Sequence, residues 1–116
     1  MSERDYRLFL QDILDSIVKM EKYTKDIDFK GFRTNDMIMD AVIRNFEIIG
    51  EATVNIPNEI QKKYSSIPWK KMKAMRNIVI HEYFGLDYNI AWRTIKKSLP
   101  ALKVKIIRAI KQESEK

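Results

Sequence analysis

The sequence contains no cysteine, and this absence removes several classes of protein at once. Without thiols there is no disulfide framework and no thiolate metal site. The single histidine cannot build a His-rich zinc site on its own. Only carboxylates are left as ligands, and these could hold a hard cation.

Long apolar runs are also missing. No stretch approaches the roughly 20 apolar residues that cross a bilayer, and the charged start at residues 1–5 does not resemble a signal peptide. We therefore expect a cytoplasmic protein without a membrane segment. The 116 residues are the usual size of one domain with a single core, so we expect one domain over residues 1–116.

Glycine and proline are scarce, with three of each, and apolar residues recur at three- and four-residue spacing along almost the whole chain. This pattern predicts an all-α fold with short connections. The expected helices cover about 3–26, the stretch from a cap at Thr34 or Asn35 to Pro57, about 58–64, about 68–83, and the segment after a cap at Asp87. We expect Gly31 in a connecting loop, a kink or division at Pro100, and fraying over 112–116.

The chain is basic, with a net charge of +6 and a pI near 9.5. Such a charge favours a polyanionic partner, although an unremarkable basic surface gives the same number. Lys70, Lys71 and Lys73 begin the predicted 68–83 helix and could guide a phosphate backbone toward the residues that follow. A solvated lysine face is the alternative interpretation.

The only histidine, His81, follows Arg76 by five residues on this predicted helix. Histidine can take and give a proton near neutral pH, and arginine offers a fixed fork of donors for phosphate oxygens, which together suit RNA cleavage. Chance supplies such a pair easily, so its surroundings must decide. In the alternative interpretation His81 caps the helix C-terminus and Arg76 lies on a solvated face.

Helical geometry separates the members of this group. At about 100° per residue, Asn77 and His81 share one side, whereas Arg76 and Tyr83 share another side about 140° from the histidine. A compact site is easier to build if two copies of the helix meet across a two-fold axis, which predicts a homodimer.

Several neighbouring residues have two interpretations. Asn77 is an amide among apolar residues and needs a partner, either in a site or as a satisfied core polar group. The alternative interpretation of the aromatic residues Tyr83, Trp69 and Trp92 is that they belong to the core.

Two glutamates flank Gly50 on the predicted second helix, at a spacing of four residues. A carboxylate of Glu47 or Glu51 could orient Arg44 or Arg76, or could simply face solvent.

The residues above stand in blocks whose order resembles the HepT-like toxins of the HEPN superfamily. The blocks are residues 41–52, 67–69, 75–85, Trp92 and 99–102. The family motif is an arginine, a polar residue, a short spacer and a histidine, often with a tyrosine two residues later. Arg76, Asn77, His81 and Tyr83 match it position by position.

The resemblance implies an antiparallel HEPN-like bundle of about five helices that dimerises so that two motifs share a cleft. It implies a metal-independent endoribonuclease that needs no cofactor, acts on RNA, and uses Arg76, Asn77 and His81 as catalytic residues. It also implies a type VII toxin–antitoxin pair, in which an MntA-like nucleotidyltransferase antitoxin attaches AMP to Tyr83.

Two other functions stay open at this point. A non-catalytic helper that binds a nucleotidyltransferase and its substrate would have the same fold and motif. A helical DNA-binding regulator would need an exposed polar recognition helix, and the apolar residues 75–80 disfavour this.

Overall fold

The computed structural model describes residues 4–77 and 87–115, and within these ranges every regular element is a helix. The all-α prediction is therefore confirmed. The elements are α1 (Tyr6–Thr24), α2 (Phe29–Thr34), α3 (Asp36–Val54), α4 (Asn58–Lys63), α5 (Trp69–Lys73), α7 (Tyr88–Arg93), the π-helical segment η1 (Thr94–Ser98) and α8 (Leu99–Ser114). None of the described helices is both long and apolar enough to span a membrane.

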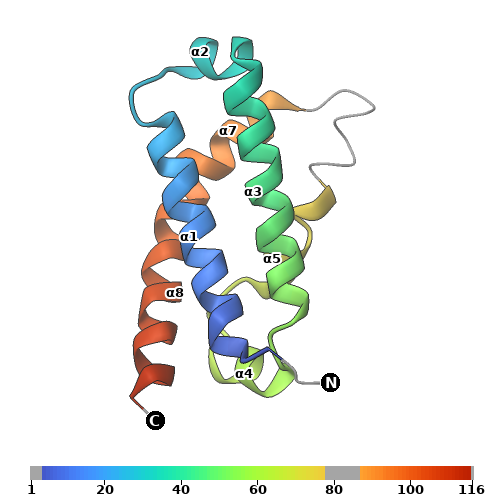
Figure 1. Ribbon diagram of the computed structural model, residues 1–116, viewed down its shortest axis with the longest axis vertical. Coiled ribbons are helices and arrows are strands. Elements are labelled where there is room, and N and C mark those ends of the chain that lie inside the picture. The colour runs from blue at the N-terminus through green and yellow to red at the C-terminus, as the bar shows by residue number, and fades with distance from the viewer. Residues whose placement is uncertain (1–3, 78–86, 116) are drawn as a thin grey trace.

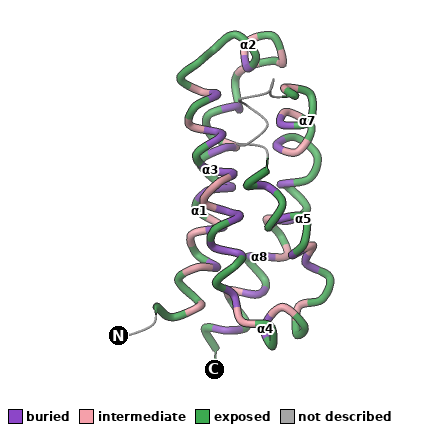
Figure 2. The backbone as a smooth tube through the Cα atoms, turned by 90° about the vertical axis from the view of Figure 1, so that its right-hand side faces the viewer, coloured by how far each residue is buried: buried purple, intermediate pink, exposed green. Residues whose placement is uncertain are grey.

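The three longest helices form the body of the bundle. Helices α1 and α3 lie side by side and run in opposite directions, and α8 packs along α1 (Figure 1). Figure 2 shows α1 and α3 on one side of the molecule and α5, α7 and α8 on the other. Short α4 closes the end at which both described termini lie.

The predicted apolar spacing places the core as expected. Residues three or four apart lie on one face of a helix, and each large apolar side chain buried there contributes about 1.5–3 kcal/mol to folding. Fully buried core side chains include Leu10, Ile13, Ile17, Met20, Phe32, Val42, Phe46, Ile49, Met72, Ile95, Leu99 and Ile106.

Two of the predicted helix caps are confirmed. The Asn35 side chain accepts a hydrogen bond from the Ile38 N–H at 3.0 Å and begins α3. The Asp87 side chain accepts from the N–H groups of Asn89 and Ile90 and begins α7. Each cap satisfies helix N–H groups that have no partner within their own helix.

The prediction of a loop at Gly31 is wrong, because Gly31 lies inside α2. Asp28 caps this short helix and accepts the Gly31 N–H at 2.8 Å. Helix α2 is fixed by aromatic packing, since the rings of Phe29 and Phe32 both contact Trp92 of α7.

Trp69 is buried, as expected of a core anchor. Its indole N–H donates to the carbonyl oxygens of Gln61 and Tyr64 at 3.0 and 3.1 Å. The tryptophan therefore ties the start of α5 to α4 and the residue that follows it.

The last helical segment is divided near Pro100, as predicted, by a change of helix type and not by a loop. The chain stays helical from Tyr88 to Ser114, but the five residues before Leu99 adopt the wider π-helical form. A proline lacks the N–H that an α-helix needs and crowds the preceding turn. The π-helical turn lies directly before it.

The predicted fraying over 112–116 is wrong for Glu113, which is 1% exposed. Its carboxylate accepts hydrogen bonds from the hydroxyl groups of Tyr6 and Tyr64 and from Lys63 Nζ. Helix α8 therefore extends to Ser114 because a buried carboxylate joins it to α1 and to the end of α4.

Candidate active site

The predicted helix over 68–83 is interrupted within the described residues. Helix α5 ends at Lys73, Ala74 and Met75 form a turn, and the chain is helical again at Arg76 and Asn77. Local hydrogen bonds hold the turn, because the Met75 N–H donates to the Met72 carbonyl and the Asn77 N–H to the Ala74 carbonyl. Met72 and Met75 are both buried, which fixes the turn against the core.

This interruption exposes the first two residues of the motif. Arg76 and Asn77 follow the buried Met75 and are both exposed. Asn77 is therefore not a core polar group, and that alternative is wrong. His81 and Tyr83, together with the cap and core alternatives for them, lie outside the described residues.

The aliphatic stem of Arg76 lies directly against Gly50 of α3. A Cβ placed on Gly50 would be 2.1 Å from Arg76 Cγ, 2.9 Å from its Cδ and 3.2 Å from its backbone nitrogen. No side chain fits in this space, so a glycine is required there for close approach. The contact sets the path that the arginine stem takes over α3.

The head of Arg76 pairs with the residue next to this glycine. Arg76 Nη2 lies 3.2 Å from Glu51 Oε1, and on the same face Arg44 Nη1 lies 2.8 Å from Glu47 Oε1. The prediction that a carboxylate here orients one of these arginines is confirmed for both. The Arg76 and Glu51 side chains are 46% and 56% exposed, so the pair contributes at most about 1 kcal/mol and can exchange partners.

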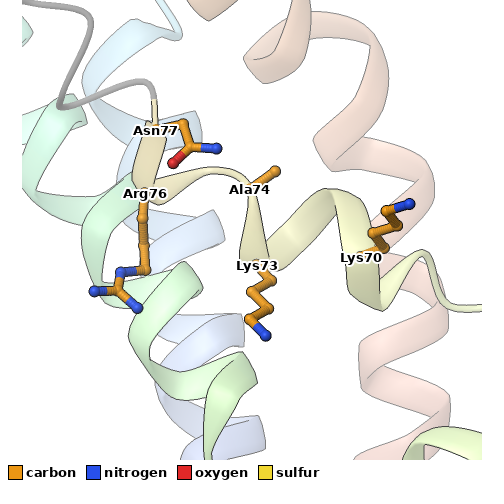
Figure 3. Close-up of a pocket in the computed structure, with 5 residues that line it drawn as sticks. All are labelled: Lys70, Lys73, Ala74, Arg76 and Asn77. Atoms are coloured by element: carbon orange, nitrogen blue, oxygen red, sulfur yellow. The ribbon is translucent and has the colours of Figure 1, made fainter.

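Two of the predicted RNA-binding lysines lie beside these residues. Lys70, Lys73, Ala74, Arg76 and Asn77 line one open hollow of about 320 Å³ (Figure 3). Figure 3 shows Arg76 and Lys73 extending along α3 and Asn77 turned to the other side of the segment. Lys71 is exposed but does not line the hollow.

The described lining of the hollow contains cations and an amide but no carboxylate. Such a lining attracts an anion, and the arginine and amide N–H groups can donate to its oxygens. The contribution of Gly50 was missed by the sequence reasoning. Its signal was a glycine in the interior of a long helix, where it costs about 1 kcal/mol relative to alanine and therefore calls for a reason.

Comparisons with known proteins identify the family of this chain. The model of the family described as "Ribonuclease HepT-like" matches residues 13–109. The chain therefore belongs to the HepT-like ribonuclease family.

Several relatives match over nearly their full length. A Methanocaldococcus jannaschii protein named as a candidate RNase is 47% identical over 91% of this chain and 97% of its own. A second candidate RNase from that organism is 43% identical over the whole of both chains. The probable ribonuclease HepT of Thermococcus cleftensis is 42% identical over 89% of this chain and 94% of its own. No solved structure matches at a significant level.

Proposed function

We propose that this chain is a metal-independent endoribonuclease whose catalytic residues are Arg76, Asn77 and His81. The observation that carries the proposal is the hollow that Arg76 and Asn77 line together with Lys70 and Lys73, which brings three cations and an amide to one place. In a member of a ribonuclease family, a lining of this charge suits a phosphate of RNA.

The reaction needs only groups of the protein and of RNA. The RNA 2′-oxygen attacks the adjacent phosphorus as His81 accepts the 2′-hydroxyl proton. The bond from phosphorus to the 5′-oxygen breaks, and that oxygen takes up a proton. The products are a 2′,3′-cyclic phosphate and a 5′-hydroxyl. Arg76 stabilises the charge that develops on the phosphoryl oxygens, and Asn77 orients the histidine or the phosphate.

The complete site requires a second copy of the chain in this proposal. On a continuous helix Arg76 and His81 would project about 140° apart, so one motif would not close around a phosphate. Two motifs that meet across a two-fold axis supply an arginine and a histidine to each side of one cleft.

The biological role we propose is that of a toxin in a type VII toxin–antitoxin pair. A nucleotidyltransferase antitoxin transfers AMP from ATP to the Tyr83 oxygen and releases pyrophosphate. The added phosphate is negative and stands two residues from His81, so it repels RNA and crowds the cleft. Mass spectrometry after co-expression tests this step, and an unmodified Tyr83 on a silenced toxin would contradict it.

Cleavage by the purified chain tests the activity. We expect wild-type protein to cut RNA in the presence of EDTA and to leave cyclic phosphate ends. Arg76→Ala and His81→Ala should lower the rate on the order of 10²-fold or more while the fold and dimer persist. Undiminished cleavage by either variant rejects the assignment. No cleavage by wild type, together with a stable nucleotidyltransferase complex, supports the helper function instead.

A further inference from the structure

The positive charge of this protein is concentrated in the second half of the chain. Residues 61–116 contain 14 lysines and arginines and 4 aspartates and glutamates, whereas residues 1–60 contain 8 and 12. The first part therefore has a net charge of −4 and the second a net charge of +10. The total of +6 hides this division.

The fold turns this division along the chain into a division in space. Helices α1, α2 and α3 come from the acidic part, and α5, α7, η1 and α8 come from the basic part. Figure 2 shows α1 and α3 on one side of the molecule and α5, α7 and α8 on the other. The side formed by α5, α7, η1 and α8 is therefore strongly basic, whereas α1, α2 and α3 together carry a net charge of only −1.

Few carboxylates neutralise the basic side. In the described part of the second half, Asp87 caps α7, Glu113 is buried, and Glu115 stands at the end of α8. Two carboxylates of the acidic part form salt bridges with cations of the basic part: Glu21 pairs with Lys103, and Glu51 pairs with Arg76.

The exposed cations of the basic side include six that have no described carboxylate within ion-pair distance and that belong to α5, α7, η1 and α8. Two more exposed cations meet the same description, but Lys96 donates to the Thr24 carbonyl oxygen and Lys111 lies in the last turn of α8. We call the other six the basic strip: Lys70, Lys71, Lys73, Arg93, Lys97 and Arg108. Their charge is available to a ligand, because the described salt bridges do not use it.

The two parts of the basic strip are joined. Lys105 Nζ of α8 donates to the Ser66 carbonyl oxygen at 2.8 Å, just before α5. Lys97 and Arg108 flank Lys105 at spacings of eight and three residues, so they share its side of the helix. Arg108 lies eleven positions after Lys97, which is about 16 Å along a helix. That length accommodates more than one phosphate of a nucleic acid backbone.

We infer that the backbone of the RNA substrate runs along the basic strip, from the hollow at Arg76 across to η1 and α8. The inference rests on the proposed function, because that function makes RNA the ligand. The continuity of the strip with the hollow favours a nucleic acid over an acidic protein. Charge contacts of this kind read the backbone and not the bases, so the strip sets affinity and orientation without sequence preference.

Binding of an RNA that cannot be cut tests the inference. The probe is a short single-stranded RNA with 2′-O-methyl groups, and its affinity is measured from about 50 to about 200 mM salt. The strip variant is Lys97→Gln/Arg108→Gln. The matched control is Lys19→Gln/Lys22→Gln, which removes the same charge from exposed residues of α1.

We expect the strip variant to bind several-fold to about tenfold more weakly. Its log–log salt dependence should be flatter by about 0.7 for each phosphate that the protein no longer neutralises. The control should stay within about twofold of wild type. Equal weakening in both variants, or unchanged binding by the strip variant, overturns the inference.

The same measurements separate this inference from the proposed activity. If the strip variant binds more weakly as expected but the wild-type chain does not cut RNA, only the proposed activity is contradicted. If the wild-type chain cuts RNA and the strip variant matches it in both binding and cleavage, only the strip is contradicted.

Discussion

Arg76 lies across Gly50 so closely that the glycine has no room for a β-carbon. The two residues are 26 positions apart in the sequence, and their contact sets how an arginine of the proposed site leaves the backbone. The rigid helix α3 thereby supports a residue that follows a turn, which gives the side chain a fixed path.

Replacement of Gly50 by alanine should displace Arg76. The new methyl group would meet the arginine stem at 2.1 Å and its backbone nitrogen at 3.2 Å, so we expect a loss of about 1–3 kcal/mol in the free energy of unfolding and a marked loss of RNA cleavage. The matched control is Gly31→Ala, whose methyl group would approach its neighbours no closer than 3.3 Å. Thermal melts and cleavage rates that do not distinguish the two variants would contradict the contact.

Glu51→Ala should lower the cleavage rate without lowering stability. The ion pair with Arg76 is half-exposed, so its loss changes the free energy of unfolding by less than about 1 kcal/mol. A misdirected arginine should still reduce kcat roughly three- to tenfold. Glu51→Gln keeps an acceptor oxygen and should retain most of the rate. Glu47→Ala removes the equivalent partner of Arg44 and should change neither kcat nor KM.

Glu113→Ala should be strongly destabilising. It would leave two tyrosine hydroxyl groups and the Lys63 ammonium without their shared acceptor, and we expect a cost on the order of 3 kcal/mol. Denaturant unfolding measures this cost. Glu115→Ala, on an exposed residue two positions later, should stay within about 0.5 kcal/mol of wild type. Similar effects of the two changes would mean that the Glu113 contacts do not hold α8.

Alkaline pH should weaken the same end of the bundle. The hydrogen bond to Glu113 raises the pKa of Tyr6 above its ordinary value, and burial followed by the bond to Glu113 raises the pKa of Tyr64. Because the pKa of each tyrosine is higher in the folded state, the protonated hydroxyl groups stabilise the fold fully at a pH below the unfolded pKa of about 10. This stabilisation is lost as the pH rises through the pKa values of the folded state. Unfolding from pH 8 upward should show this loss. Tyr6→Phe/Tyr64→Phe should reduce it, and a loss of unchanged size would contradict the assignment.

Local chemistry made much of the fold predictable. The caps Asn35 and Asp87 form bonds within three residues of themselves, so the sequence alone marks where α3 and α7 begin. Asp28 carries the same local signal three residues before Gly31, and it begins α2. The glycine predicted a loop, but it is tolerated in this short helix because the packing of Phe29 and Phe32 on Trp92 holds the helix.

The remaining features depend on contacts between distant residues. The turn at Ala74 and Met75 interrupts a segment whose apolar pattern suits a continuous helix, and it is held by burial of Met72 and Met75 in the core. Burial of Glu113 needs partners about 50 and 107 positions away. For the site, the sequence left open whether Glu47 or Glu51 pairs with an arginine or faces solvent. The glycine inside α3 called for a reason, but nothing local showed that Arg76 packs on it. The predictions for His81 and Tyr83 fall outside the described residues and stay predictions.

The π-helical turn before Pro100 fixes how many residues the chain can have between its two ends. Before the turn, Trp92 packs on the aromatic rings of α2. Beyond the turn, at the opposite end of the bundle, Glu113 accepts hydrogen bonds from its three partners. Because its hydrogen bond spans five residues instead of four, the turn holds about one residue more than an α-helical turn would. A continuous α-helix with the same number of residues would therefore turn Glu113 by about 100° relative to Trp92, away from its partners. The number of residues in this segment and its π-helical form are matched to each other.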